Sequence, residues 1–216
     1  MEIFSNLVQK ITNIVRKCCS VGYKTDRVLV VFLSGPSGVG KTTIESKLLK
    51  MNKNWTRLKS TTTRARRDSN DNLSYNFVSL SRFKEMVKKE DFIFHMKSNY
   101  SDDVLYGFAK IDINKAVKCH DVITINAHAS SVKIIKDNLK KMGIKNVSIF
   151  ISPPSIVELK KRIQNRNSES QDDIKVRLSK AKDEIKFAKT FDYQIINDNL
   201  NKTIKQINRI IYQNLK

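Results

Sequence analysis

Residues 35–42, Gly-Pro-Ser-Gly-Val-Gly-Lys-Thr, match the phosphate-binding pattern G-x-x-x-x-G-K-[ST]. The glycines let backbone amides turn inward around phosphate oxygens, and the helix that the motif opens adds partial positive charge. The ammonium group of Lys41 can reach the β- and γ-phosphates, and the Thr42 hydroxyl can ligate Mg²⁺. The motif therefore predicts a nucleoside triphosphate site that holds magnesium. A chance match is disfavoured because a predicted strand and helix flank it.

A second group of hydroxyl and basic residues spans Ser60 to Arg67. Arg64 and Arg67 lie three residues apart behind a run of threonines. Because an arginine fork binds phosphate through two parallel hydrogen bonds, we expect a second phosphate site here. Tyr75 and Tyr106 are candidates to hydrogen-bond the same phosphate. The alternative is a solvated basic loop, which is common in a chain this cationic.

A third basic group lies near the carboxyl end, at Arg162, Arg166 and Arg177. Arg162 and Arg166 are four residues apart and share one face of a predicted helix. The residues at 167–173 are polar and loop-like. Such a segment could be a mobile lid that carries arginines onto a transferring phosphoryl group. The alternative is a pair of surface helices with solvated charges.

The elements that must position these groups alternate between strands and helices. Val28–Leu33 is rich in β-branched residues and ends at Ser34-Gly-Pro, which predicts a strand buried on both faces. Further strands are expected at Val122–Asn126, Val147–Ile151 and, more weakly, Tyr193–Asn197. Helical patterns cover 42–51, 130–142, 154–166, 172–189 and 199–215. The alternation predicts right-handed βαβ units around a parallel sheet.

Residues 56–108 break this alternation. Short strands at Tyr75–Ser79 and Phe92–Met96, joined by a helix at Leu80–Lys89, indicate an inserted α+β lobe. The predicted fold class is therefore an α/β, three-layer P-loop fold with a parallel core sheet, an inserted lobe for a nucleoside monophosphate and a helical lid. Residues 1–27 are expected to form an amphipathic helix and a linker. A membrane-surface or organelle-targeting role for residues 1–20 stays open.

Composition limits the partners and the compartment. Among 216 residues, 41 are Lys or Arg and 21 are Asp or Glu, so the net charge of +20 predicts anionic partners. The 40% of hydrophobic residues excludes global disorder. An odd count of three cysteines fits a reducing compartment, so a cytoplasmic location is expected. The longest apolar run is too short to span a bilayer. Because no aromatic-interleaved RNA motif is present, we expect no specific nucleic-acid partner.

Together these motifs resemble those of the guanylate kinase family, from about Val28 to Leu215. The family pattern G-P-S-G-x-G-K-[ST]-T stands at Gly35–Thr43, and S-x-T-T-R-x-x-R ends at Arg67. The family's Y-N-F is Tyr75–Phe77, and the P-P-S that opens its lid is Pro153–Ser155. Several independent motifs therefore occur in the family's order.

The resemblance implies an enzyme that moves the γ-phosphoryl group of ATP to GMP with Mg²⁺. It assigns ATP binding to Gly35, Ser37, Gly38, Gly40, Lys41, Thr42 and Thr43, with Asn197 near adenine and Thr42 on the metal. It assigns the acceptor phosphate to Ser60, Arg64, Arg67, Tyr75 and Tyr106. Lys41 and the lid arginines Arg162, Arg166 and Arg177 would stabilise charge during transfer. The implied domain covers residues 28–216, with the monophosphate lobe at about 56–108 and the lid at about 154–189.

The sequence departs from the family where the base is recognised. Phe94 replaces a glutamate that accepts hydrogen bonds from guanine, and Phe108 replaces a hydroxyl residue. Thr124 and Asn126 replace both aspartates of the family's D-x-D strand. Unpaired guanine donors cost about 1–3 kcal/mol per group. Three readings follow: weak phosphorylation of GMP, a different monophosphate acceptor, or an impaired homologue that binds nucleotide or a phosphoprotein through Arg64 and Arg67.

Overall fold

The computed structural model describes residues 27–66, 69–98, 103–164 and 171–215. The helix predicted within residues 1–27 lies outside these ranges, as do Arg67 and Arg166. Within the described ranges, no helix is both long and apolar enough to cross a membrane.

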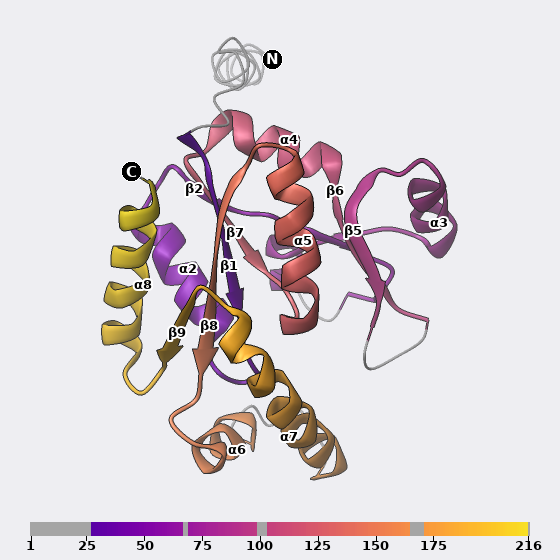
Figure 1. The fold of residues 1–216 in the computed structure, drawn as a ribbon. Helices are drawn as coiled ribbons and strands as arrows, with labels where there is room; N and C mark the ends of the chain where they lie inside the picture. The colour runs from indigo at the N-terminus through magenta and orange to yellow at the C-terminus, as the bar shows by residue number, and fades with distance from the viewer. Residues whose placement is uncertain (1–26, 67–68, 99–102, 165–170, 216) are drawn as a thin grey trace, which may run out of the picture.

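A parallel sheet of five strands, in the order β2-β7-β1-β8-β9, forms the centre of the molecule (Figure 1). Its strands are β1 (Leu29–Ser34), β2 (Trp55–Arg57), β7 (Val122–Asn126), β8 (Lys145–Ser152) and β9 (Tyr193–Ile196). Every residue of β1 is buried, as expected for a β-branched strand at the middle of a parallel sheet. The predicted parallel core sheet is confirmed. The edge strand β2 was not predicted, because three residues carry too little pattern.

Helices cover both faces of this sheet, which makes three layers. Leu29, Val31 and Leu33 of β1 face one core together with α2 (Lys41–Met51) and α8 (Leu200–Leu215). Val30 and Phe32 face the other core with α4 (Lys110–Cys119) and α5 (Ala129–Lys141). Successive residues of one strand thus divide between two cores. The sequence did not predict α4, whose polar residues leave only Ile113 and Val117 buried.

A second sheet of four strands, in the order β4-β3-β6-β5, forms the inserted lobe. Its strands are β3 (Ser60–Thr62), β4 (Tyr75–Phe77), β5 (Phe92–Lys97) and β6 (Leu105–Ala109), and η2 (Ser69–Leu73) precedes β4. Helix α3 (Leu80–Lys88) packs on this sheet through Phe83, whose ring stacks on Phe92 at 4.6 Å between centroids. The predicted α+β lobe is therefore present, with two strands, β3 and β6, beyond those expected.

Two helices follow β8 and lie beyond the carboxyl ends of β8 and β9 (Figure 1). They are α6 (Ile156–Gln164) and α7 (Gln171–Lys186), and the short turn η3 (Phe187–Thr190) leads from α7 towards β9. Leu159, Ile163 and Ile174 join the core on the α2 and α8 side. The base of this helical pair is therefore anchored to the sheet.

Asp192 links three elements just before β9. Its carboxylate accepts hydrogen bonds from the Ser148 amide at 2.7 Å, from the Ser148 hydroxyl at 2.8 Å and from the Lys136 ammonium. Partial burial raises the pKa of Asp192, but the hydrogen bonds from Lys136 and Ser148 lower it by more, so the net shift is downward. The folded state therefore favours the charged carboxylate.

We predict that the free energy of unfolding falls less steeply at acidic pH in Asp192→Asn than in the wild-type protein. A carboxyl group with a lowered folded pKa contributes stability above its unfolded pKa of about 3.9, and loses it as pH falls through the folded value. Urea unfolding of both proteins at a series of pH values measures this. Near neutral pH the free energies of unfolding of the two proteins should change with pH in the same way. Below about pH 4 the wild-type protein should lose more stability than the variant. Equal slopes at low pH would contradict the assignment.

Candidate active site

The phosphate-binding loop joins β1 to α2, the strand–turn–helix context that the sequence predicted. Gly35 and Gly40 have φ angles of 139° and 101°, a backbone conformation that residues with a side chain rarely adopt. A Cβ atom on Gly35 would lie 2.1 Å from the carbonyl oxygen of Ile151. These two glycines are therefore needed for the turn itself and for its close approach to β8.

The loop and the start of α2 form an electropositive cradle. The Lys41 ammonium donates to the carbonyl oxygens of Gly35 and Pro36, the latter at 3.0 Å. No side chain among the described residues caps α2, whose N-cap position is Gly40. The first-turn amides of a helix carry partial positive charge and suit an anionic phosphate. Thr42 and Thr43 are exposed in this turn, so their hydroxyl groups are available to a ligand.

Three further predicted residues converge on the loop from the carboxyl-terminal third of the chain. The buried amide of Asn197 donates to the Val39 carbonyl oxygen at 2.8 Å. Arg162 donates to the Asn197 carbonyl oxygen at 3.2 Å. Arg177 donates to the Ser37 hydroxyl oxygen at 3.0 Å. The two predicted lid arginines that the structure describes therefore lie beside the phosphate-binding loop. Asn197 supports that loop through its hydrogen bond to Val39.

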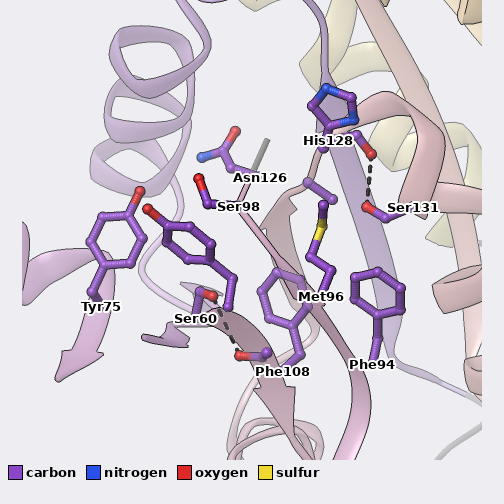
Figure 2. A pocket seen from close by; sticks show the side chains of 12 residues that line it. Ser60, Tyr75, Phe94, Met96, Ser98, Phe108, Asn126, His128 and Ser131 are labelled. Atoms are coloured by element: carbon purple, nitrogen blue, oxygen red, sulfur yellow. Dashed lines mark hydrogen bonds between the residues drawn. The ribbon is translucent and has the colours of Figure 1, made fainter. Parts of the chain in front are cut away.

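A pocket of about 220 Å³ lies between the lobe and the core sheet. Ser60, Tyr75 and Tyr106 contribute hydroxyl groups, and the rings of Tyr75 and Tyr106 are 6.1 Å apart between centroids. Figure 2 shows an apolar side formed by Phe94, Met96 and Phe108, with Asn126, His128 and Ser131 on the core side. The chain thus brings three predicted acceptor-phosphate residues together. It also places both substituted phenylalanines in the same cavity.

Arg64 lies next to this pocket. Its guanidinium carbon is 4.9 Å from the centre of the Tyr75 ring, a cation–π distance. Its Nη2 atom also lies 2.9 Å from a carboxylate oxygen of Asp71, and the Arg64 side chain is only 11% exposed. Asp71 was not predicted as part of the site. It holds Arg64 beside the tyrosines, so an incoming phosphate would meet an arginine whose position is already fixed.

A buried carboxylate behind the pocket was not predicted from the sequence. Glu45 of α2 is fully buried and lies 2.6 Å from a guanidinium nitrogen of Arg57. Its carboxylate accepts from the Thr124 hydroxyl at 2.6 Å and from the Asn126 side-chain amide. Glu45 precedes the buried Leu48 by three residues, a spacing that places both on the inward face of the helix. That spacing was the available signal for this residue.

His128 joins the pocket to α7. Its side chain caps α5 by accepting from the Ser130 amide at 3.4 Å, and its Nε2 atom is 3.4 Å from a carboxylate oxygen of Glu184. Glu184 is 7% exposed. The histidine thus has structural contacts on both sides, as expected for a lone histidine. It also connects the pocket wall to the helix that carries Arg177.

The fold and these two adjoining sites define the class of protein. A phosphate-binding loop after the central strand, arginines from following helices, and an inserted lobe with a hydroxyl-lined pocket are the parts of a P-loop nucleoside monophosphate kinase. Comparisons narrow this class. A sequence model described as guanylate kinase matches residues 26–214, so the chain belongs to the guanylate kinase family. The family resemblance expected from the motifs is confirmed.

Individual relatives agree. The chain is 40% identical over 192 residues to a guanylate kinase of Mesomycoplasma hyopneumoniae strain 7448, covering 87% of this chain and 95% of the relative. It is 35% identical over 184 residues to a guanylate kinase of Rickettsia prowazekii, covering 85% and 90%. The crystal structure of guanylate kinase from Anaplasma phagocytophilum superposes with a TM-score of 0.65 at 24% identity, covering 88% of this chain and 87% of that one. This last comparison shows the shared fold.

We predict that Asn197→Ala loosens the phosphate-binding loop. The substitution removes the buried hydrogen bond to Val39, which should lower the free energy of unfolding by about 1–3 kcal/mol. Urea denaturation measures the change. Asn201→Ala, at an exposed position of α8, is the matched control and should behave like the wild-type protein. If both variants are equally stable, Asn197 does not support the loop.

Proposed function

We propose that this protein transfers the γ-phosphoryl group of ATP to GMP with the help of Mg²⁺. One observation carries the proposal. Leu33 of β1 pairs with Asn126 of β7, so both parallel strands end at one edge of the sheet. The phosphate-binding loop follows β1, and pocket residues follow β7. Ser34 donates to the Ala127 carbonyl oxygen at 2.9 Å, which ties the start of the loop to the pocket wall. Donor and acceptor sites are therefore neighbours.

On the ATP side, the chain supplies amides, one ammonium group and hydroxyls. The backbone amides of residues 35–42 and the Lys41 side chain would hold the β- and γ-phosphates, with Ser37 and Thr43 beside them. Across the described ranges no group of three or more His, Cys, Asp or Glu side chains could hold a metal ion. The exposed Thr42 hydroxyl and the phosphate oxygens would therefore hold Mg²⁺, a cation that usually keeps several waters. When bound, it neutralises charge on the phosphates.

On the acceptor side, Ser60, Tyr75 and Tyr106 would donate hydrogen bonds to the phosphate of the monophosphate. Arg64, held by Asp71 and stacked on Tyr75, would add positive charge at close range. The motif adds Arg67 to this set. The acceptor would then be held beside the phosphate-binding loop, and proximity alone accounts for much of the rate of such transfers.

Arg177 and Arg162 would neutralise negative charge as the phosphoryl group moves between the two sites. Arg177 already contacts the loop through Ser37. Arg162 is held by Glu158 at 3.0 Å and by the Asn197 carbonyl oxygen. The motif adds Arg166 as a third lid arginine. We place the lid at about residues 154–189 and the monophosphate lobe at about 56–108. The cytoplasmic location stays a prediction.

A second candidate rests on the apolar side of the pocket. Phe94 and Phe108 lie opposite each other on β5 and β6, and Met96 completes the side that they form. None of these side chains can pair with the polar edge of guanine. A different monophosphate acceptor, or binding of a phosphoprotein at Arg64 without catalysis, would suit such a pocket.

An acceptor panel separates the candidates. ADP release from Mg²⁺·ATP is measured by a coupled assay with GMP, AMP, CMP or UMP as the acceptor. We expect GMP to give the highest kcat/KM. A higher kcat/KM with another monophosphate would show that this other monophosphate, and not GMP, is the preferred acceptor. No acceptor-dependent turnover, together with binding of a phosphopeptide, would favour the non-catalytic candidate.

We predict that Lys41→Ala lowers kcat by about 100- to 1,000-fold, the usual effect of removing one charge-stabilising donor. The melting temperature should change little, because the hydrogen bonds described above join Lys41 to carbonyl groups of its own loop. Lys47→Ala, at an exposed position on the same helix, is the control and should keep wild-type turnover. Unchanged kcat in the Lys41 variant would remove this lysine from the mechanism.

We predict that Phe94→Glu raises kcat/KM for GMP by about 10-fold, because a carboxylate in the pocket can accept the guanine N–H groups. Phe94→Leu keeps the wall apolar and should give no gain. Steady-state kinetics with GMP and AMP measures the ratio for each protein. If the glutamate variant favours GMP no more than the leucine variant does, Phe94 does not face the base.

A further inference from the structure

We propose that Glu45 is a positioning residue that sets the hydrogen-bonding polarity with which Asn126 meets the acceptor base. The inference rests on the proposed function, because it takes the pocket lined by Asn126 to be the base site. Glu45 itself lies behind the pocket, on α2, and is completely buried. Its effect on a bound base would therefore pass through Asn126.

The carboxylate of Glu45 fixes the orientation of the Asn126 amide. An ionised carboxylate accepts hydrogen bonds and cannot donate them. The side-chain NH₂ group of Asn126 must therefore point towards Glu45, as it does in the structure. The carbonyl oxygen Oδ1 is then the acceptor that Asn126 can offer a ligand, beside the second N–H of its NH₂ group.

Other contacts prevent Glu45 from turning away. Arg57 pairs with the same carboxylate oxygen that Asn126 contacts, at 2.6 Å, and Thr124 donates to the second oxygen at 2.6 Å. Arg57 also donates to the Ser74 hydroxyl at 2.7 Å, next to Tyr75 in the lobe. The cluster therefore ties α2, β2 and β7 to the start of β4. Its members hold one another in a single arrangement.

The carbonyl oxygen of Asn126 is buried and accepts no hydrogen bond from any described residue. A buried acceptor without a partner is unfavourable by about as much as a hydrogen bond is worth. An N–H group of the bound base would remove this penalty. Phe94, Met96 and Phe108 cannot supply polar contacts on the opposite wall. The site thus requires a base that presents a donor to Asn126, as guanine does with N1–H and its 2-amino group.

Glu45→Leu tests the inference by removing the acceptor that orients Asn126. A leucine side chain accepts no hydrogen bond, so the NH₂ group of Asn126 would no longer be held towards α2. Asn126 could then rotate and present its NH₂ group to the base. We expect kcat/KM for GMP to fall by about 10- to 100-fold, with the KM for ATP nearly unchanged. A rise in the KM for ATP with GMP unaffected would assign the Asn126 oxygen to the nucleotide side and overturn the inference.

Adding Asn126→Asp to Glu45→Leu separates positioning from a purely structural role. An aspartate presents an acceptor in either orientation, and Arg57, left without Glu45, can pair with it. The double variant should therefore recover most of the lost GMP kcat/KM. A double variant as impaired as Glu45→Leu alone would contradict the inference. Asp192→Asn is the control: it removes an ion pair with Lys136 outside the pocket, so it should leave the KM for GMP unchanged.

Asn126→Leu keeps the inference testable if Glu45→Leu fails to fold, since the Glu45–Arg57 pair remains intact. It should lose GMP affinity by the same factor, and wild-type GMP affinity in this variant would overturn the inference. NMR of the Asn126 side-chain amide gives a readout without any nucleotide. Its protons should exchange slowly in the wild-type protein and faster in Glu45→Leu. Slow exchange with no GMP turnover would reject the proposed function alone, and fast exchange in the wild-type protein would reject the role of Glu45.

Discussion

Leu33 lies opposite Asn126 where the parallel strands β1 and β7 end, and this register sets the relation between the two halves of the site. The loop that follows β1 turns at once into α2, and the segment that follows β7 turns into α5. Ligand groups bound by these two turns must therefore lie side by side. The lobe and the helices α6 and α7 add side chains to that edge. The position of this sheet edge, however, depends on the buried apolar residues of β1 and β7, which fix the register of the two strands far from any ligand.

Electrostatics imposes the second constraint, because two phosphate groups that repel each other have to approach closely. Three of the described cationic side chains around the site are held before a ligand arrives: Lys41 by loop carbonyls, Arg64 by Asp71, and Arg162 by Glu158. Holding them reduces the reorganisation that binding would require. Asp71 and Glu158 also offset the positive charge of the arginines that they contact, in a chain with a net charge of +20. A strongly basic composition is thus compatible with a site in which these described cations have partners.

The sequence predicts what is local and misses what tertiary packing decides. The strand, loop and helix of residues 29–51 are encoded by adjacent residues, so their prediction agrees with the structure. Strands β2, β3 and β6 have mixed side chains and three to five residues each, and they form only because a neighbouring strand supplies hydrogen bonds. The motif placed Asn197 near adenine, whereas its buried contact with Val39 depends on how β9 ends. Glu45 lies within the expected helix at residues 42–51, but the sequence did not predict its contacts with β2 and β7.

The Glu45 cluster shows how a carboxylate can reach a family site from a different element. By the family resemblance, Thr124 and Asn126 replace two aspartates, and β7 ends without a carboxylate of its own. Glu45 brings one carboxylate to the same place from α2 and pairs it with Arg57. A carboxylate accepts in either orientation, whereas an amide accepts in only one. Base recognition in this chain therefore depends on how Asn126 is turned. That dependence makes a residue behind the pocket as important for specificity as the residues that line it.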